Sequence, residues 1–135
     1  MNDLLDLATF RSGRFAPVLP EDSQVNPGCY GAELAYWLCL RLAERGVVTS
    51  YPDAEDWGWM LGYATDAGDE FALLCGNVDG VNDAWVLALR RFGRKLFGRD
   101  KPPFAHAEPL ILALRAVLDA EETITALEWQ IPTAS

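Results

Sequence analysis

Cys29 and His106 are the residues whose types best fit covalent chemistry. Cys29 lies in the stretch NPGCYGAELAYW, where a helix is predicted to begin, and His106 is the only histidine in the chain. The start of a helix lowers the pKa of a thiol, and a neutral imidazole can accept a proton. One hypothesis is therefore a cysteine–histidine pair that performs acyl transfer. The alternative, which we favour, is a buried cysteine in a protein that is not an enzyme.

The placement of Cys29 resembles that of the cysteine in papain-like peptidases of bacterial cell walls, where a cysteine also opens a helix. In those enzymes the histidine lies on a strand of the sheet that follows. His106 instead precedes the second predicted helix, so the sequence departs from the pattern at the base.

Metal and cofactor motifs are missing from the sequence. The three cysteines, Cys29, Cys39 and Cys75, form no C-x-x-C pair, and one histidine excludes a multi-histidine centre. No glycine-rich phosphate or dinucleotide motif is present either. We therefore expect no bound metal and no cofactor.

A basic segment interrupts an acidic chain. Six of the eleven basic residues lie in it: Arg90, Arg91, Arg94, Lys95, Arg99 and Lys101. With Asp100 as its only acid, this window has a formal charge of +5, and the remainder carries −14 of the net −9. Basic residues among aromatics suit an anionic surface or nucleic acid, but the acidic remainder repels nucleic acid and favours a basic protein partner. A solvated loop is the other interpretation.

The elements that must position these residues follow from periodicity. Apolar residues at helical spacing predict helices over 29–45 and 107–122. Shorter β-branched or uncharged runs predict strands, namely 14–20 at an edge, 47–51, 55–64, 71–77, 84–92 and 124–132. Residues 1–13 are expected to form a loose arm. The order β-α-β-β-β-β-α-β predicts one α+β domain over 1–135, with a mostly antiparallel sheet and both helices on one face.

The stretch EDWGWMLGYA alternates large aromatics with glycine and other small residues. Because small residues let helices approach a sheet closely, we expect the aromatics to point away from the helices. The predicted interface is Trp57, Trp59, Tyr63, Trp85 and Trp129. An apolar surface of this kind usually marks an interaction site. The alternatives are a reversed parity with the tryptophans under the helices, a covering loop or arm, and a ligand cavity.

The chain also lacks the features of a membrane or secreted protein. No apolar run reaches the ~18 residues of a membrane span, and acids occupy the N-terminus where a signal peptide needs positive charge. We expect a cytoplasmic protein.

Three further segments, EDWGWMLGYA, LLCGNVDG and FGRKLFGRD, carry a resemblance to a family of small bacterial α+β proteins to which no activity is assigned. The resemblance implies a single α+β domain and a bacterial setting, and it implies no site.

Together these patterns predict a non-enzymatic protein–protein interaction module. It would form a homodimer, bind a basic partner in the manner of an immunity protein, or do both, through the aromatic face. The alternative is a small ligand-binding protein or cysteine-dependent enzyme with a pocket near Cys29. A further alternative is binding of an anionic surface or nucleic acid through residues 90–101.

Overall fold

The computed structural model describes residues 4–17, 30–55, 58–78, 80–92 and 102–130. The strands in these segments are β1 (Leu4–Arg11), β2 (Asp53–Glu55), β3 (Gly58–Ala64), β4 (Glu70–Asn77), β5 (Ala84–Arg91) and β6 (Thr125–Trp129). The α-helices are α1 (Ala32–Glu44) and α2 (Glu108–Ala120), and two short 3-10 helices are η1 (Gly13–Phe15) and η3 (Phe104–Ala107).

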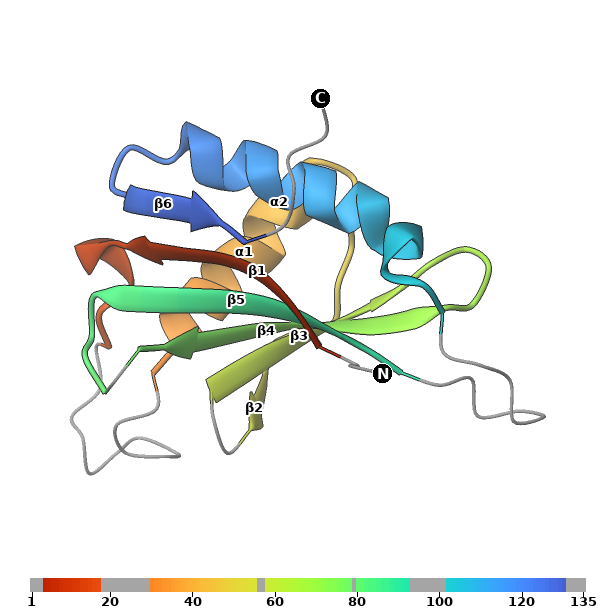
Figure 1. Ribbon diagram of the computed structural model, residues 1–135, viewed down its shortest axis with the longest axis horizontal. Coiled ribbons are helices and arrows are strands. Elements are labelled where there is room, and N and C mark those ends of the chain that lie inside the picture. Colours follow the sequence, from red (N-terminus) through yellow and green to blue (C-terminus); the bar gives the residue numbers. More distant parts are fainter. Residues whose placement is uncertain (1–3, 18–29, 56–57, 79, 93–101, 131–135) are drawn as a thin grey trace.

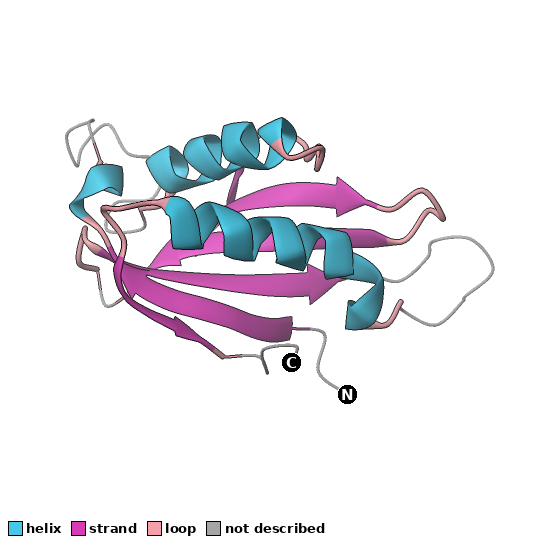
Figure 2. Cartoon of the chain, turned by 90° about the horizontal axis from the view of Figure 1, so that it is seen from above, coloured by secondary structure: helices cyan, strands magenta, loops and turns pink. Residues whose placement is uncertain are grey.

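The described strands form one six-stranded sheet in the order β2-β3-β4-β5-β1-β6, and every neighbouring pair is antiparallel. Both α-helices lie on the same face of this sheet (Figures 1 and 2). The predicted α+β class, the antiparallel sheet and the placement of both helices on one face are confirmed.

The two helices follow from the spacing of their apolar residues. In α1, Leu34, Leu38 and Leu42 recur every four residues and are buried against the sheet. Gly46, with a φ of 84°, lies just beyond the C-terminus of α1 in the left-handed conformation that ends many helices. In α2, Leu110 and Leu114 repeat the same spacing and are buried. Within the described residues, no helix is both long and apolar enough to cross a membrane.

The prediction of a loose arm over residues 1–13 is wrong for residues 4–13, which the structure describes. Leu4–Arg11 is strand β1, and it lies between β5 and β6 inside the sheet. A shift of register between Asp6 and Ala8 adds one residue, so that Leu7 is buried out of the two-residue alternation. This bulge hides the strand pattern from a sequence-based reading.

The prediction of an edge strand over residues 14–20 is also wrong for residues 14–17, which the structure describes. Ser12 caps the short η1 helix there, with its Oγ accepting from the N–H of Arg14. Phe15 is buried, with its ring centroid 4.9 Å from that of Trp37. Residues 18–20 lie outside the described residues.

Residues 47–51 were expected to form a strand, and only one of them pairs with the sheet. The N–H of Ser50 donates to the carbonyl of Gly62 over 2.8 Å, and the Gly62 N–H donates to Ser50 Oγ over 2.8 Å. The strand at this edge is instead β2, which begins at Asp53, between the strands expected over 47–51 and 55–64. The serine side chain takes the place of a second backbone partner, so no continuous ladder forms.

Candidate functional site

Trp85 does not belong to a surface. Its side chain is completely buried on the face that the helices cover. The indole Nε1 donates to the carbonyl of Ser12 over 2.9 Å, and the ring meets the Phe15 ring edge-on at 6.3 Å. The prediction that Trp85 is an interface residue is therefore wrong, because a partner cannot reach it.

The other described aromatics of the predicted interface, Trp59, Tyr63 and Trp129, are partly buried and pack against the same core. A Cβ placed on Gly31, at the start of α1, would lie 3.5 Å from Trp59 Cδ1. The guanidinium of Arg115, on α2, lies 4.5 Å from the ring centroid of Trp129. The expectation that these aromatics point away from the helices is wrong, and the reversed parity holds. Trp57 lies outside the described residues.

The size of the side chains explains this parity. A large aromatic buries about 150–250 Å², which is worth roughly 4–6 kcal/mol at about 25 cal/mol per Å². Glycine and alanine offer a helix a close approach but little area. The free energy gained by burying the aromatics exceeds the gain from a closer approach of the helices, so the small residues face away from the helices.

The opposite side of the sheet, here called the helix-free face, is lined by small and aliphatic residues. Cross-strand pairing places Met60, Leu74 and Ala88 in one row, and Gly62, Ala72 and Arg90 in the next. The helix-free face as a whole comprises Met60, Gly62 and Ala64 of β3, Ala72, Leu74 and Gly76 of β4, Val86, Ala88 and Arg90 of β5, and Leu4 and Asp6 of β1. Its centre is apolar, and Ala72, Leu74 and Gly76 within it are buried.

Two hollows lie against the helix-free face. One, of about 310 Å³, is lined mainly by apolar atoms and lies over Leu4, Leu74, Val86 and Ala88, with Arg90 at its side. The other, of about 450 Å³, lies at the β3 edge of this face. Tyr63 and Phe71 of the helix-covered face line it together with Met60, Gly62, Phe92 and residues 48–50. A surface with shallow apolar hollows matches a docking face better than an enclosed active site.

His106 meets a carboxylate rather than a thiol among the described residues. Its Nδ1 lies 2.8 Å from Oδ2 of Asp69, whose side chain is 2% exposed, whereas that of His106 is 53% exposed. Asp69 is held by the β3–β4 turn, where its N–H donates to Thr65 Oγ1 over 3.1 Å. The contact joins η3 to this turn, and it orients the imidazole as a carboxylate does in hydrolytic triads.

The two thiols that the structure describes lie in different surroundings. Cys75 is completely buried in β4, and burial raises the pKa of its thiol. The Sγ of Cys39 lies 3.6 Å from both the Ser50 carbonyl and Thr49 Oγ1. Cys29 lies outside the described residues, so the cysteine–histidine hypothesis stays a prediction.

The basic segment is described only at its start. Arg90 lies on the helix-free face, opposite Ala72. Arg91 donates from Nη1 to the Pro102 carbonyl over 3.4 Å, and its guanidinium lies 5.0 Å from the Phe104 ring centroid. Arg94, Lys95, Arg99 and Lys101 lie outside the described residues. Within the described segments, no group of three or more His, Cys, Asp or Glu residues could hold a metal ion.

Sequence reasoning missed the helix-free face because it expected the small residues of the 55–64 strand to point toward the helices. The signal of this face was present: Met60, Ala72, Leu74, Val86 and Ala88 hold the positions between the aromatic and leucine residues of three successive strands. A solvated face would carry polar residues at such positions. That absence of polar residues was the available clue.

Comparison with known proteins adds no family. No family model, no curated protein and no solved structure matches the chain.

Proposed function

We propose that this protein is a non-enzymatic interaction module that binds another protein through the helix-free face, and that its first partner is a second copy of itself. The observation that supports this proposal is the row of Met60, Leu74 and Ala88 across three central strands. An antiparallel sheet with one free face normally presents polar residues there, because water is the neighbour. Here both described helices cover the other face (Figure 2).

A second sheet suits this surface better than a helix alone. Stacked sheets pack about 10 Å apart, and their inner residues interdigitate. Gly62 and Ala88 are partly exposed and leave room for the larger residues of a partner, while Met60 and Val86 are the partly exposed larger apolar residues. A two-fold axis through the face would bring the same residues of each copy together.

The net charge sets the conditions for this dimer. Each chain carries −9, so two copies repel each other when salt is low. Screening shortens this repulsion to about 8 Å at physiological ionic strength, where the apolar contact can dominate. The same charge favours a basic protein as the second candidate partner. The proposal also includes a cytoplasmic location.

The experiment replaces one residue on each side of the sheet. Ala88→Glu places a charge in the centre of the helix-free face, whereas Leu112→Glu places one on α2, where Leu112 is exposed. Sedimentation velocity should show a monomer for Ala88→Glu and a dimer for Leu112→Glu. Equal masses for the two variants would contradict the proposal.

A further inference from the structure

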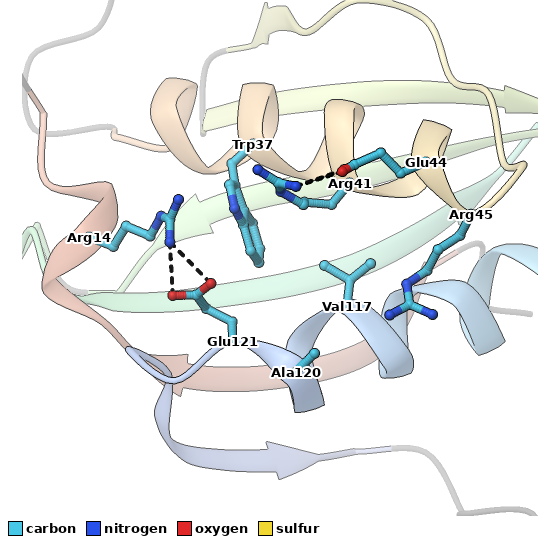
Figure 3. A pocket seen from close by; sticks show the side chains of 8 residues that line it. All are labelled: Arg14, Trp37, Arg41, Glu44, Arg45, Val117, Ala120 and Glu121. Atoms are coloured by element: carbon cyan, nitrogen blue, oxygen red, sulfur yellow. Dashed lines mark hydrogen bonds and ion pairs between the residues drawn. The ribbon is translucent and has the colours of Figure 1, made fainter.

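A groove lies between α1 and α2, on the side of the helices that faces away from the sheet (Figure 3). Its volume is about 510 Å³, within the range of small-molecule sites. It is lined by Arg14, Trp37, Arg41, Glu44, Arg45, Val117, Ala120 and Glu121. Arg14 of η1, with Arg41 of α1 and Arg45 at the end of α1, thus surrounds one hollow in an acidic protein.

Two of the three arginines are already paired. Arg14 donates from Nη1 to the Glu121 carboxylate over 3.0 and 3.1 Å. Arg41 donates from Nη1 to the Glu44 carboxylate over 2.6 and 2.7 Å. The side chain of Arg45 makes no ion pair or hydrogen bond within the described part of the chain. The groove therefore holds one positive charge that no carboxylate balances.

The groove also has an aromatic wall and an apolar floor. The Trp37 indole projects from α1 between Arg14 and Arg41 toward Glu121, and Val117 and Ala120 rise from α2 below it (Figure 3). The Arg14 guanidinium lies 5.6 Å from the Trp37 ring centroid. The Nε1–H of Trp37 is buried and has no acceptor among the described residues. A donor in this state favours any group that supplies an oxygen.

We propose that this groove binds a small aromatic monocarboxylate. The carboxylate pairs with Arg45, and the ring packs against Trp37, Val117 and Ala120. The buried N–H of Trp37 belongs to the ring against which the ligand packs, so its NMR signal reports binding.

The charge count selects a monoanion over a phosphate. One unbalanced guanidinium matches a single negative charge, and its fork suits the two oxygens of a carboxylate. A dianionic phosphate needs a second free cation, but Arg14 and Arg41 are held by Glu121 and Glu44. These two carboxylates would repel the additional charge.

Benzoate is the probe for the test, with its neutral isostere benzamide and the dianion phenylphosphate for comparison. Heteronuclear NMR follows the five tryptophan indole N–H signals of the full chain during each titration. Loss of one signal in Trp37→Phe assigns that of Trp37. We expect benzoate to shift this signal saturably at millimolar concentration, and benzamide and phenylphosphate to bind at least about tenfold more weakly.

Arg45→Gln removes the unbalanced charge from an exposed position, and we expect it to weaken benzoate binding about tenfold. Arg11→Gln is the matched control, because Arg11 is exposed and pairs with Asp83 elsewhere on the surface. Absence of a saturable shift would overturn the proposal. So would equal binding by benzamide, tighter binding by phenylphosphate, or equal losses in the two arginine variants.

Discussion

Leu74 lies directly opposite Ala88 across the β4–β5 ladder, on the face of the sheet that carries no described helix. Leu74 is only 7% exposed, whereas Ala88 is partly exposed. Met60 continues the row on β3. Met60 and Ala88 remain partly in contact with water in the single chain. The row becomes a source of binding energy when a second apolar surface covers it.

Trp85 provides a test of which face is buried. Trp85→Phe leaves the Ser12 carbonyl without its donor and opens a small cavity beside Phe15. We expect the free energy of unfolding to fall by about 2–3 kcal/mol, because both the hydrogen bond and the packing are lost. Urea unfolding, followed by circular dichroism, measures this change.

The matched control for Trp85→Phe is Tyr36→Phe, since Tyr36 is half exposed on α1. This substitution should alter the free energy of unfolding by no more than about 0.5 kcal/mol. If Trp85→Phe leaves stability unchanged and instead shifts the oligomeric state, the assignment of Trp85 to the core is wrong.

Much of the fold was predictable because local patterns decide it. The four-residue spacing of Leu34, Leu38 and Leu42 specifies α1, and the alternation of small and large apolar residues over 84–89 is typical of β5. Strand β1 was missed, since Asp6 and the bulge beside it interrupt the alternation. Both features are encoded in the sequence, but they are recognised as parts of a strand only when its pairing with β5 and β6 is known.

The face that the helices cover was not predictable from alternation. Trp59 and Gly62 occupy opposite faces of β3, and the sequence shows this without showing which face is covered. That choice depends on how much area each arrangement buries, which cannot be known before the sheet and the helices are placed together. The inter-helix groove was missed for a different reason. The four-residue spacing of Trp37, Arg41 and Arg45 places them on one side of α1, but it does not show that residues of α2 lie opposite them.

Gly31 is required by a close approach at the start of α1. Its φ is +138°, and a Cβ there would lie 2.8 Å from the carbonyl oxygen of Cys75. We expect Gly31→Ala to lower the free energy of unfolding by about 2 kcal/mol or more, because backbone strain and the contact both oppose the methyl group. Thermal unfolding by calorimetry measures the loss.

Gly13→Ala is the control for this substitution, since no atom lies within 4 Å of a Cβ placed there. It should change stability by about 0.5 kcal/mol or less. Equal losses for Gly31→Ala and Gly13→Ala would show that the approach of α1 to β4 is looser than described.

Glu121 links the groove to pH. The hydrogen bond from Thr123, and the Arg14 guanidinium next, hold the pKa of the Glu121 carboxyl below its usual range. A carboxyl whose pKa is lower in the folded state stabilises the fold above its unfolded pKa of about 4.3. That contribution is lost as the pH falls through the lowered pKa. Urea unfolding should therefore show Glu121→Gln to be less stable than the wild type at neutral pH.

We expect this difference in stability to shrink as the pH falls below about 4. Glu122→Gln removes the same formal charge from an exposed neighbour and is the matched control. A difference for Glu121→Gln that stays constant from neutral pH to pH 3 or so would contradict the assigned role of the Thr123 and Arg14 contacts.

The central claim is that the helix-free face holds a second copy of the chain. Light scattering of the unmodified protein, over a concentration series at physiological and at low salt, tests it most directly. We predict a molar mass of twice 14.9 kDa at high concentration and physiological salt, with dissociation when salt is removed. A mass of 14.9 kDa at every concentration and salt would contradict the claim.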